Sequence, residues 1–181
     1  MADDMRYYET FYGIHLTDWE VNYPAFTNHH KILTKEYYSE GCSEVTSSIG
    51  NETYKFIYPH HLKKTYFIEG VIKGHITLAA TSSASVTFAD YRVSVCKVDD
   101  AGAEDELFST GWVTIYSGEL SCESEEEIVL PFEIDAWDRE KLDENDRIYV
   151  KVQTDSQVNG VLWHSNDATW EDLKITIPFI L

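Results

Sequence analysis

Apolar residues alternate with polar residues in one run after another from Tyr54 to Leu181. Between Tyr66 and Leu78, every second residue is apolar except for two glycines. Successive side chains of a strand point to opposite faces of a sheet, so this pattern predicts a strand with one buried face. Similar runs, separated by turn-forming residues, predict about eight strands in all. The chain is therefore expected to be all-β.

One stretch has a helical pattern instead. Asp135 is a suitable N-cap for residues 136–142, so we expect one short helix there. About eight strands with such a crossover fit a two-sheet antiparallel β-sandwich of jelly-roll topology. An immunoglobulin-like sandwich is the alternative.

The predicted core gathers the apolar residues that lie on the buried side of each long run. A chain of 181 residues is long enough for one domain with one such core, which we place at residues 51–181. The expected core residues are Ile68, Ile72, Val93, Val95, Val113, Ile128, Leu130, Phe132, Ile148, Val150, Ile175 and Ile177.

The first fifty residues differ from the rest of the chain, because they are rich in aromatic residues but only weakly periodic. This composition predicts an extended arm over residues 1–50, draped over its own sandwich or over a neighbouring subunit. Aromatic side chains supply much of the energy of protein interfaces. Candidate interface residues in the arm are Tyr7, Tyr8, Phe11 and Tyr12.

Acidic residues outnumber basic ones by 32 to 14, which gives a formal net charge of −18. Phosphate binding requires a basic surface, so nucleic acids and anionic membranes are not expected as partners. The charge favours solubility, and a docking surface for a basic partner is the alternative. The chain begins without a basic segment followed by an apolar one, so we expect no secretory signal peptide. Three cysteines without metal-ligand spacing are typical of a reducing compartment.

No catalytic or metal-binding motif is recognisable. The chain lacks a Gly-x-Ser-x-Gly nucleophile motif, a phosphate loop and a dinucleotide-binding glycine motif. The histidine pairs at residues 29–30 and 60–61 are adjacent, so on a strand they point to opposite faces and chelate one metal poorly. The acidic cluster at residues 135–146 is the best calcium candidate, but Arg147 stands where an EF-hand ligand is needed. We expect a protein without enzymatic activity, cofactor or metal.

Two further groups of aromatic residues are candidate binding surfaces. The run at residues 107–116 is apolar on both faces, with Phe108, Trp112 and Tyr116 on one of them. Burial under the arm or another subunit is the favoured interpretation, and stacking of sugar rings is the alternative. A polar loop near the C-terminus is flanked by two tryptophans, which suit either a sugar site or a packed corner. The candidate sugar-binding residues there are Trp163, Trp170, Asn166 and Asp167.

Four features follow one another along the chain. They are the aromatic start with Tyr7 and Tyr8, the runs Tyr66–Ile72 and Tyr91–Val98, and the late segment Lys141–Val152. In this order they resemble the jelly-roll accessory proteins found in particles of tailed viruses of bacteria and archaea. The resemblance covers roughly residues 50–181 and the arm only loosely. Asn145 is a departure, because these proteins usually have glycine in the turn before the last long strand.

The resemblance implies a non-enzymatic structural protein that decorates a capsid or belongs to the head–tail junction or the tail. It implies a homo-oligomer in contact with other virion proteins, located in the virion after assembly in the host cytoplasm. The competing hypothesis is a carbohydrate-binding module or lectin-like domain. The two hypotheses are compatible, because a virion protein can also bind a glycan.

Overall fold

A computed structural model describes residues 5–15, 21–29, 31–36, 45–46, 52–80, 88–116, 127–156, 161–163 and 173–181 of the chain. All regular elements within these ranges are β-strands. The prediction of an all-β chain is therefore confirmed. No membrane-spanning helix is found within the same ranges.

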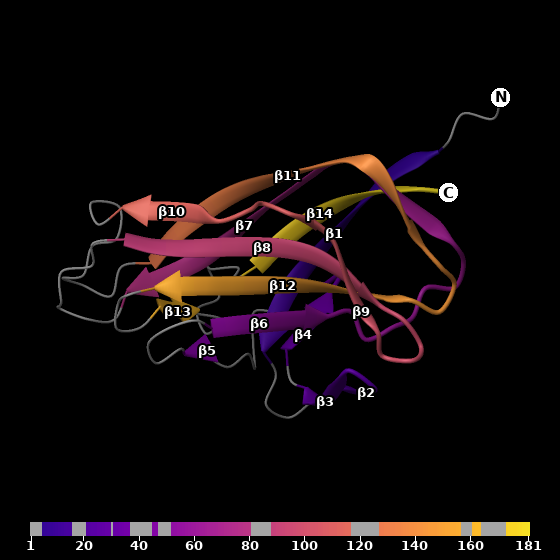
Figure 1. Ribbon diagram of the computed structural model, residues 1–181, viewed down its shortest axis with the longest axis horizontal. Helices are drawn as coiled ribbons and strands as arrows, with labels where there is room; N and C mark the ends of the chain where they lie inside the picture. Colours follow the sequence, from indigo (N-terminus) through magenta and orange to yellow (C-terminus); the bar gives the residue numbers. More distant parts are fainter. Residues whose placement is uncertain are drawn as a thin grey trace.

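Twelve of the described strands form one sheet, and the two others form a hairpin (Figure 1). In spatial order, the sheet contains β10 (Val113–Tyr116), β8 (Phe88–Val98), β12 (Arg147–Ser156), β6 (Glu52–Ile57), β4 (Lys31–Thr34), β1 (Arg6–His15), β14 (Leu173–Ile180), β7 (Tyr66–Ala80), β13 (Val161–Trp163) and β5 (Val45–Thr46). In addition, β11 (Glu127–Leu142) pairs with β7, and β9 (Glu104–Ser109) pairs with β8. The hairpin consists of β2 (Val21–Tyr23) and β3 (Phe26–His29).

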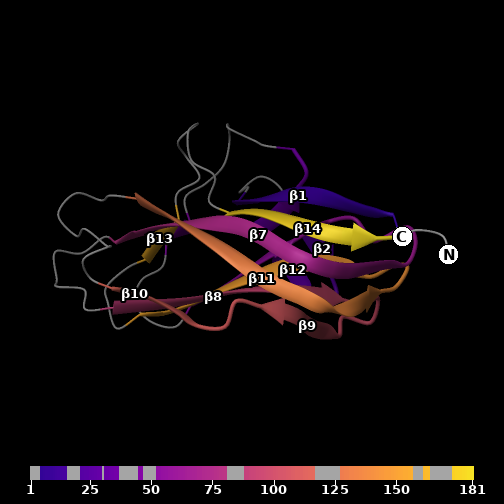
Figure 2. The same ribbon diagram turned by 90° about the horizontal axis from the view of Figure 1, so that it is seen from above.

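The sheet folds back on itself, so that its two halves face each other as layers (Figure 2). Along the sheet, β8, β12 and β6 are neighbours in one half, and β1, β14 and β7 are neighbours in the other. The halves are joined where β4 pairs with β6 in parallel, at Ile32 and Ile57. On the other side, β11 crosses towards β9 and lies against it (Figure 2). The arrangement is close to that of a closed barrel.

The main core fills the space between the layers, because the apolar side of each long strand points inward. Val113 and Leu130, which were expected in this core, are only partly buried against it. The side chain of Ile128 lies outside the described part of the chain. The other expected core residues are all buried, namely Ile68, Ile72, Val93, Val95, Phe132, Ile148, Val150, Ile175 and Ile177.

Three of the described strands of the first fifty residues, β1, β4 and β5, belong to this sheet. β1 lies between β14 and β4, with Tyr7 paired to Phe179 and Phe11 paired to Ile175. Phe11 is buried, and the Tyr7 ring stacks on the Phe179 ring at 5.6 Å between centroids. β1 is thus an internal strand, whereas the sequence had suggested an arm over a finished sandwich. Its pairing satisfies backbone groups of β14 that would otherwise form an open edge.

The predicted helix at residues 136–142 is wrong. These residues form the end of β11, which is paired with β7. The register shifts between Ala136 and Glu140, so residues 137–139 bulge opposite Glu69. The bulge interrupts the alternation that marks a strand, and the segment around it contains the good helix formers Ala136, Arg139, Glu140, Lys141 and Leu142. Pairing with β7 overrides that local preference.

The irregularity at this bulge continues across β7 into β14. The register between these two strands shifts between Thr176 and Phe179, at Pro178. Proline has no N–H to donate to a ladder, which suits a point where pairing is interrupted. Gly70 of β7 has a φ of 131°, and a Cβ built there would lie 3.4 Å from the Pro178 ring. A Cβ at that distance makes ordinary van der Waals contact, so the backbone conformation, which residues with a side chain rarely adopt, is what favours glycine here.

The run at residues 107–116 is two strands rather than the single strand predicted. β9 and β10 both pair with β8, and a turn at residues 110–112 separates them. In this turn the N–H of Thr110 donates to the Val93 carbonyl at 3.0 Å, and Oγ1 of Thr110 accepts from the Val93 N–H at 3.1 Å. Because the strand is interrupted, Phe108 is buried in the core while Trp112 is 51% exposed.

Asn145 lies in the tight turn between β11 and β12, with a φ of 78°. This left-handed conformation favours glycine, and asparagine adopts it more readily than most residues. Across the turn, Oδ2 of Asp146 accepts a hydrogen bond from the Asp143 N–H at 2.8 Å. The acidic residues here thus shape a turn. In the part of the chain that the structure describes, no group of three or more His, Cys, Asp or Glu side chains is placed to hold a metal ion.

The β2–β3 hairpin covers part of the outer side of β8 and β12. The Phe26 ring packs edge-on against the Tyr149 ring at 5.3 Å, and the Tyr23 hydroxyl donates to the Asp99 carbonyl at 2.6 Å. Cys96 belongs to the same small cluster and is buried. Burial raises the pKa of the Cys96 thiol to about 11, so this group is protonated at neutral pH and packs as a small apolar side chain.

Candidate functional site

The structure separates the aromatic residues that were expected to form interfaces. Phe11 faces the core, and Tyr7 is half-buried against it. Tyr8, in contrast, is 62% exposed on the other side of β1. Tyr12 lies on that side as well, with the ammonium group of Lys174 5.5 Å from its ring centroid.

The remaining aromatic candidates lie elsewhere. Trp112 is exposed in the turn between β9 and β10, and Tyr116 is in β10, with a side chain outside the described part. Trp163 is in β13, and its side chain is likewise outside that part. The other expected sugar-binding residues, Trp170, Asn166 and Asp167, also lie outside the described residues.

The solvent-facing side of β1, β14, β7 and β11, here called the outer face, carries the first candidate site. Register brings Thr10, Thr176, Lys73 and Glu133 into one row across these four strands. A shallow depression of about 380 Å³ lies beside this row. It is lined by Arg6, Tyr8, Val71, Lys73, Trp137 and Thr176.

Two large aromatic side chains border this depression. Tyr8 is 62% exposed and Trp137 is 59% exposed. Trp137 is presented by the bulge at residues 137–139, which adds residues to β11 without adding partners on β7. The sequence prediction missed Trp137, because it placed this residue in a helix. An interrupted alternation with a tryptophan at the interruption is the signal that could have found it.

The polar groups of the outer face are already paired with one another. The Arg6 guanidinium lies 3.4 Å from a Glu69 carboxylate oxygen, and the Lys73 ammonium lies 2.8 Å from Glu133. The hydroxyl oxygens of Thr10 and Thr176 are 2.9 Å apart and share a hydrogen bond. The exposed apolar surface of the two rings is therefore the main feature left for a partner.

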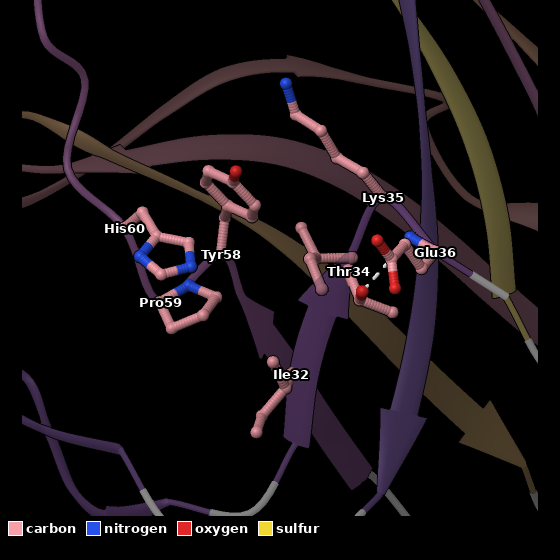
Figure 3. Close-up of a pocket in the computed structure, with 8 residues that line it drawn as sticks. Ile32, Thr34, Lys35, Glu36, Tyr58, Pro59 and His60 are labelled. Atoms are coloured by element: carbon pink, nitrogen blue, oxygen red, sulfur yellow. Dashed lines mark hydrogen bonds between the residues drawn. The ribbon is translucent and has the colours of Figure 1, made fainter. Parts of the chain in front are cut away.

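The second candidate site is an open groove between the end of β4 and the connection from β6 to β7 (Figure 3). It consists of two adjoining hollows of about 330 and 470 Å³ that share Lys35, Tyr58, Pro59 and His60. In Figure 3, the rings of Tyr58, Pro59 and His60 lie together on one side, opposite Thr34 and Glu36. The groove is lined by Ile32, Leu33, Thr34, Lys35, Glu36, Tyr58, Pro59, His60, His61, Leu62, Lys63 and Tyr66.

Backbone hydrogen bonds hold the walls of this groove. The Leu62 N–H donates to the Asp146 carbonyl at 2.8 Å, and the Asn145 N–H donates to the Leu62 carbonyl at 2.9 Å. The Tyr58 ring packs edge-on against the rings of Phe11 and His60, each at 5.3 Å between centroids. The loop that bears the histidines is thus fixed against both the core and the β11–β12 turn.

The groove could not be predicted from the sequence pattern. Its two walls lie more than twenty residues apart in the chain, and the parallel pairing of β4 with β6 brings them together. The pair His60–His61 was considered only as a metal site. The position of His60 across the groove from Glu36 depends on tertiary structure.

No family model matches the chain, and no curated protein matches it. Solved structures resemble it in fold. A CocE/NonD family hydrolase from Staphylococcus aureus matches 97% of the chain with a TM-score of 0.55 and 13% identity. An aminopeptidase from a marine sediment Thaumarchaeota archaeon matches 96% of it with a TM-score of 0.54 and 12% identity. In both comparisons the chain spans only 37% of the other protein's length.

A carbohydrate-binding module of the β-sandwich superfamily aligns with 99% of the chain and 86% of its own length. Its TM-score of 0.32 and identity of 10% are too low to support an argument. The two hydrolase likenesses describe the fold alone, because their identities are so low. Neither enzyme is described as a virion component, and the resemblance seen in the sequence stays a prediction.

Proposed function

We propose that this chain is a non-enzymatic structural module that acts through protein–protein contacts on its outer face. The observation that carries the proposal is the exposure of Tyr8 and Trp137 beside one depression of a sheet. Contiguous exposed apolar surface on a soluble domain marks an interaction site. Tyrosine, tryptophan and arginine are also the residues that dominate binding energy at protein interfaces.

The free energy available from burying the two exposed rings favours a protein partner. Full burial of an aromatic side chain removes roughly 150–250 Å² from water, at about 25 cal/mol per Å² of apolar surface. Two such rings form the centre of an interface, while the paired charges around them form a polar rim. Because the ion pairs Arg6–Glu69 and Lys73–Glu133 are complete, a partner does not have to supply compensating charges.

The jelly-roll sandwich is the specific fold that we propose for this module. Two facing, predominantly antiparallel layers around one core support it. The fold likeness to a third or so of two longer enzymes is consistent with a unit that packs against other protein parts. The setting that we propose is a virus particle, in which the chain contacts copies of itself and other virion proteins. This setting rests on the sequence resemblance described above.

Sedimentation velocity of three proteins tests the proposal. The full chain should form assemblies larger than one chain at high concentration, and the Tyr8→Ser/Trp137→Ser variant should sediment as a single chain. Trp112→Ser is the matched control, because Trp112 is 51% exposed but lies in the turn between β9 and β10. It should assemble like the full chain. A single-chain species for all three proteins, with no virion protein co-purifying, would contradict the proposal.

A further inference from the structure

We propose that the groove between β4 and the β6–β7 connection binds a neutral sugar chain. This activity is independent of assembly through the outer face. It also differs from the sugar site expected at Trp163 and Trp170, because the groove is built from residues 32–36 and 58–66.

The polar side chains of the groove differ from those of the outer face in their pairing. Within the described residues, the imidazoles of His60 and His61, the carboxylate of Glu36 and the ammonium of Lys63 have no hydrogen-bonding or ion-pair partner in the protein. The hydrogen bond between Glu36 and Thr34 runs from the Glu36 backbone N–H to Oγ1 of Thr34 at 3.1 Å, so it does not involve the carboxylate. The groove therefore offers donors and acceptors that a ligand rich in hydroxyl groups can use.

One wall of the groove offers ring surfaces. Tyr58, Pro59 and His60 are consecutive, and their rings lie together in Figure 3. A pyranose presents C–H groups on its faces and hydroxyl groups around its rim. Ring surfaces on one wall and a carboxylate and hydroxyl on the other match that distribution. Small-molecule sites commonly combine apolar walls with a few placed polar groups, in volumes of roughly 300–1,000 Å³. The two hollows, at about 330 and 470 Å³, are of that size.

The charge balance favours a neutral ligand over an acidic one. The Lys35 ammonium is 2.7 Å from a Glu9 carboxylate oxygen and is neutralised by it. Of the remaining charged side chains that line the groove, Lys63 and Glu36 carry opposite signs. The net charge of −18 on the whole chain opposes the approach of anions.

Calorimetric titration with three neutral probes tests this inference, namely β-1,4-linked hexasaccharides of glucose, mannose and xylose. At least one should bind with a dissociation constant between about 1 µM and 1 mM. His60→Ala and Glu36→Ala, both at exposed positions, should each weaken that binding by about tenfold or more. Trp137→Ser on the outer face should leave it unchanged. The imidazole proton resonances of His60 and His61 should shift on addition of the same probe.

Four results would overturn the inference. The first is no heat of binding with any of the three hexasaccharides at 10 mM, a concentration of the order expected for very weak sites. The second is tighter binding of an acidic hexagalacturonate than of the neutral probes. The third is an affinity that His60→Ala and Glu36→Ala leave unchanged. The fourth is binding that is abolished by Trp163→Ala alone, which would place the sugar near the C-terminus.

Discussion

Gly74 is a residue at which the packing of three strands leaves no room for a side chain. It pairs with Phe132 of β11 on one side and with Ile175 of β14 on the other. A Cβ built at Gly74 would collide with the Lys174 carbonyl oxygen and would lie 2.5 Å from Cζ of Phe132. The carbonyl belongs to a paired strand, so it cannot move away cheaply.

Gly74→Ala is therefore expected to lower the free energy of unfolding by about 3 kcal/mol, as overpacking of a core does. Gly111→Ala is the matched control, because a Cβ there meets nothing within 4 Å and only the φ of 71° is unfavourable. That control should cost about 1 kcal/mol. Urea denaturation of both variants measures the difference. Equal losses would show that the centre of β7 can absorb a methyl group.

At the scale of elements, alternation was sufficient to predict the long strands and most of the core. It failed where pairing is irregular, at the bulge of residues 137–139 and at the turn of residues 110–112. The left-handed conformation of Asn145, with a φ of 78°, is one that asparagine adopts more readily than most residues with a side chain. The outer face was predictable only at Tyr8, because Trp137 reaches it through the bulge.

A row of ion pairs crosses the solvent-facing side of β6, β12, β8 and β9. Lys55 contacts Glu104 at 2.5 Å, and Lys151 contacts Glu106 at 2.6 Å, while Arg92 also pairs with Glu106. Burial by itself raises the pKa of each glutamate, but the hydrogen bonds and positive charges of the neighbours outweigh it. The pKa of both carboxyl groups consequently lies below the ordinary value of 4.5.

A carboxyl group with a lowered folded-state pKa stabilises the protein above its unfolded pKa, and this contribution is lost as the pH falls through the folded value. The full chain should therefore be more stable than Glu104→Gln/Glu106→Gln at pH 7, and the difference should shrink below pH 4.5. Chemical denaturation of both proteins across this range measures it. Asp146 is present in both proteins, so its contribution cancels in the comparison. Burial raises the pKa of Asp146, so its contribution to stability changes with pH in the opposite direction. A difference in the free energy of unfolding that stays constant down to pH 3, about one unit below the ordinary glutamate pKa, would contradict the lowered pKa of the two glutamates.

The pairing of β1 with β14 allows a test of whether the first fifty residues are needed for the fold. Because β1 pairs with β14 and contributes Phe11 to the core, a chain of residues 51–181 should lack a cooperative unfolding transition and a dispersed proton spectrum. A chain lacking only residues 1–4, which precede β1, is the control and should fold normally. If residues 51–181 fold cooperatively, the first fifty residues are an appendage, as the sequence pattern had suggested.

At the scale of the whole molecule, the two candidate surfaces differ in kind. The outer face exposes aromatic rings among completed ion pairs, whereas the groove exposes unpaired polar groups beside rings. A net charge of −18 makes copies of the chain repel one another at low ionic strength. Salt screens that repulsion over distances beyond about 10 Å at 0.1 M, while an apolar contact persists. Assembly through the outer face should therefore strengthen with salt.

Hydroxyl-radical footprinting of dilute and assembled protein tests the central claim most directly. Under conditions of assembly in moderate salt, oxidation of Tyr8 and Trp137 should fall several-fold relative to the single chain, because their exposed rings become buried. Trp112, exposed in the turn between β9 and β10, should be oxidised equally in both states. Unchanged oxidation of Tyr8 and Trp137 in the assembled protein, or protection of Trp112 in their place, would contradict the account.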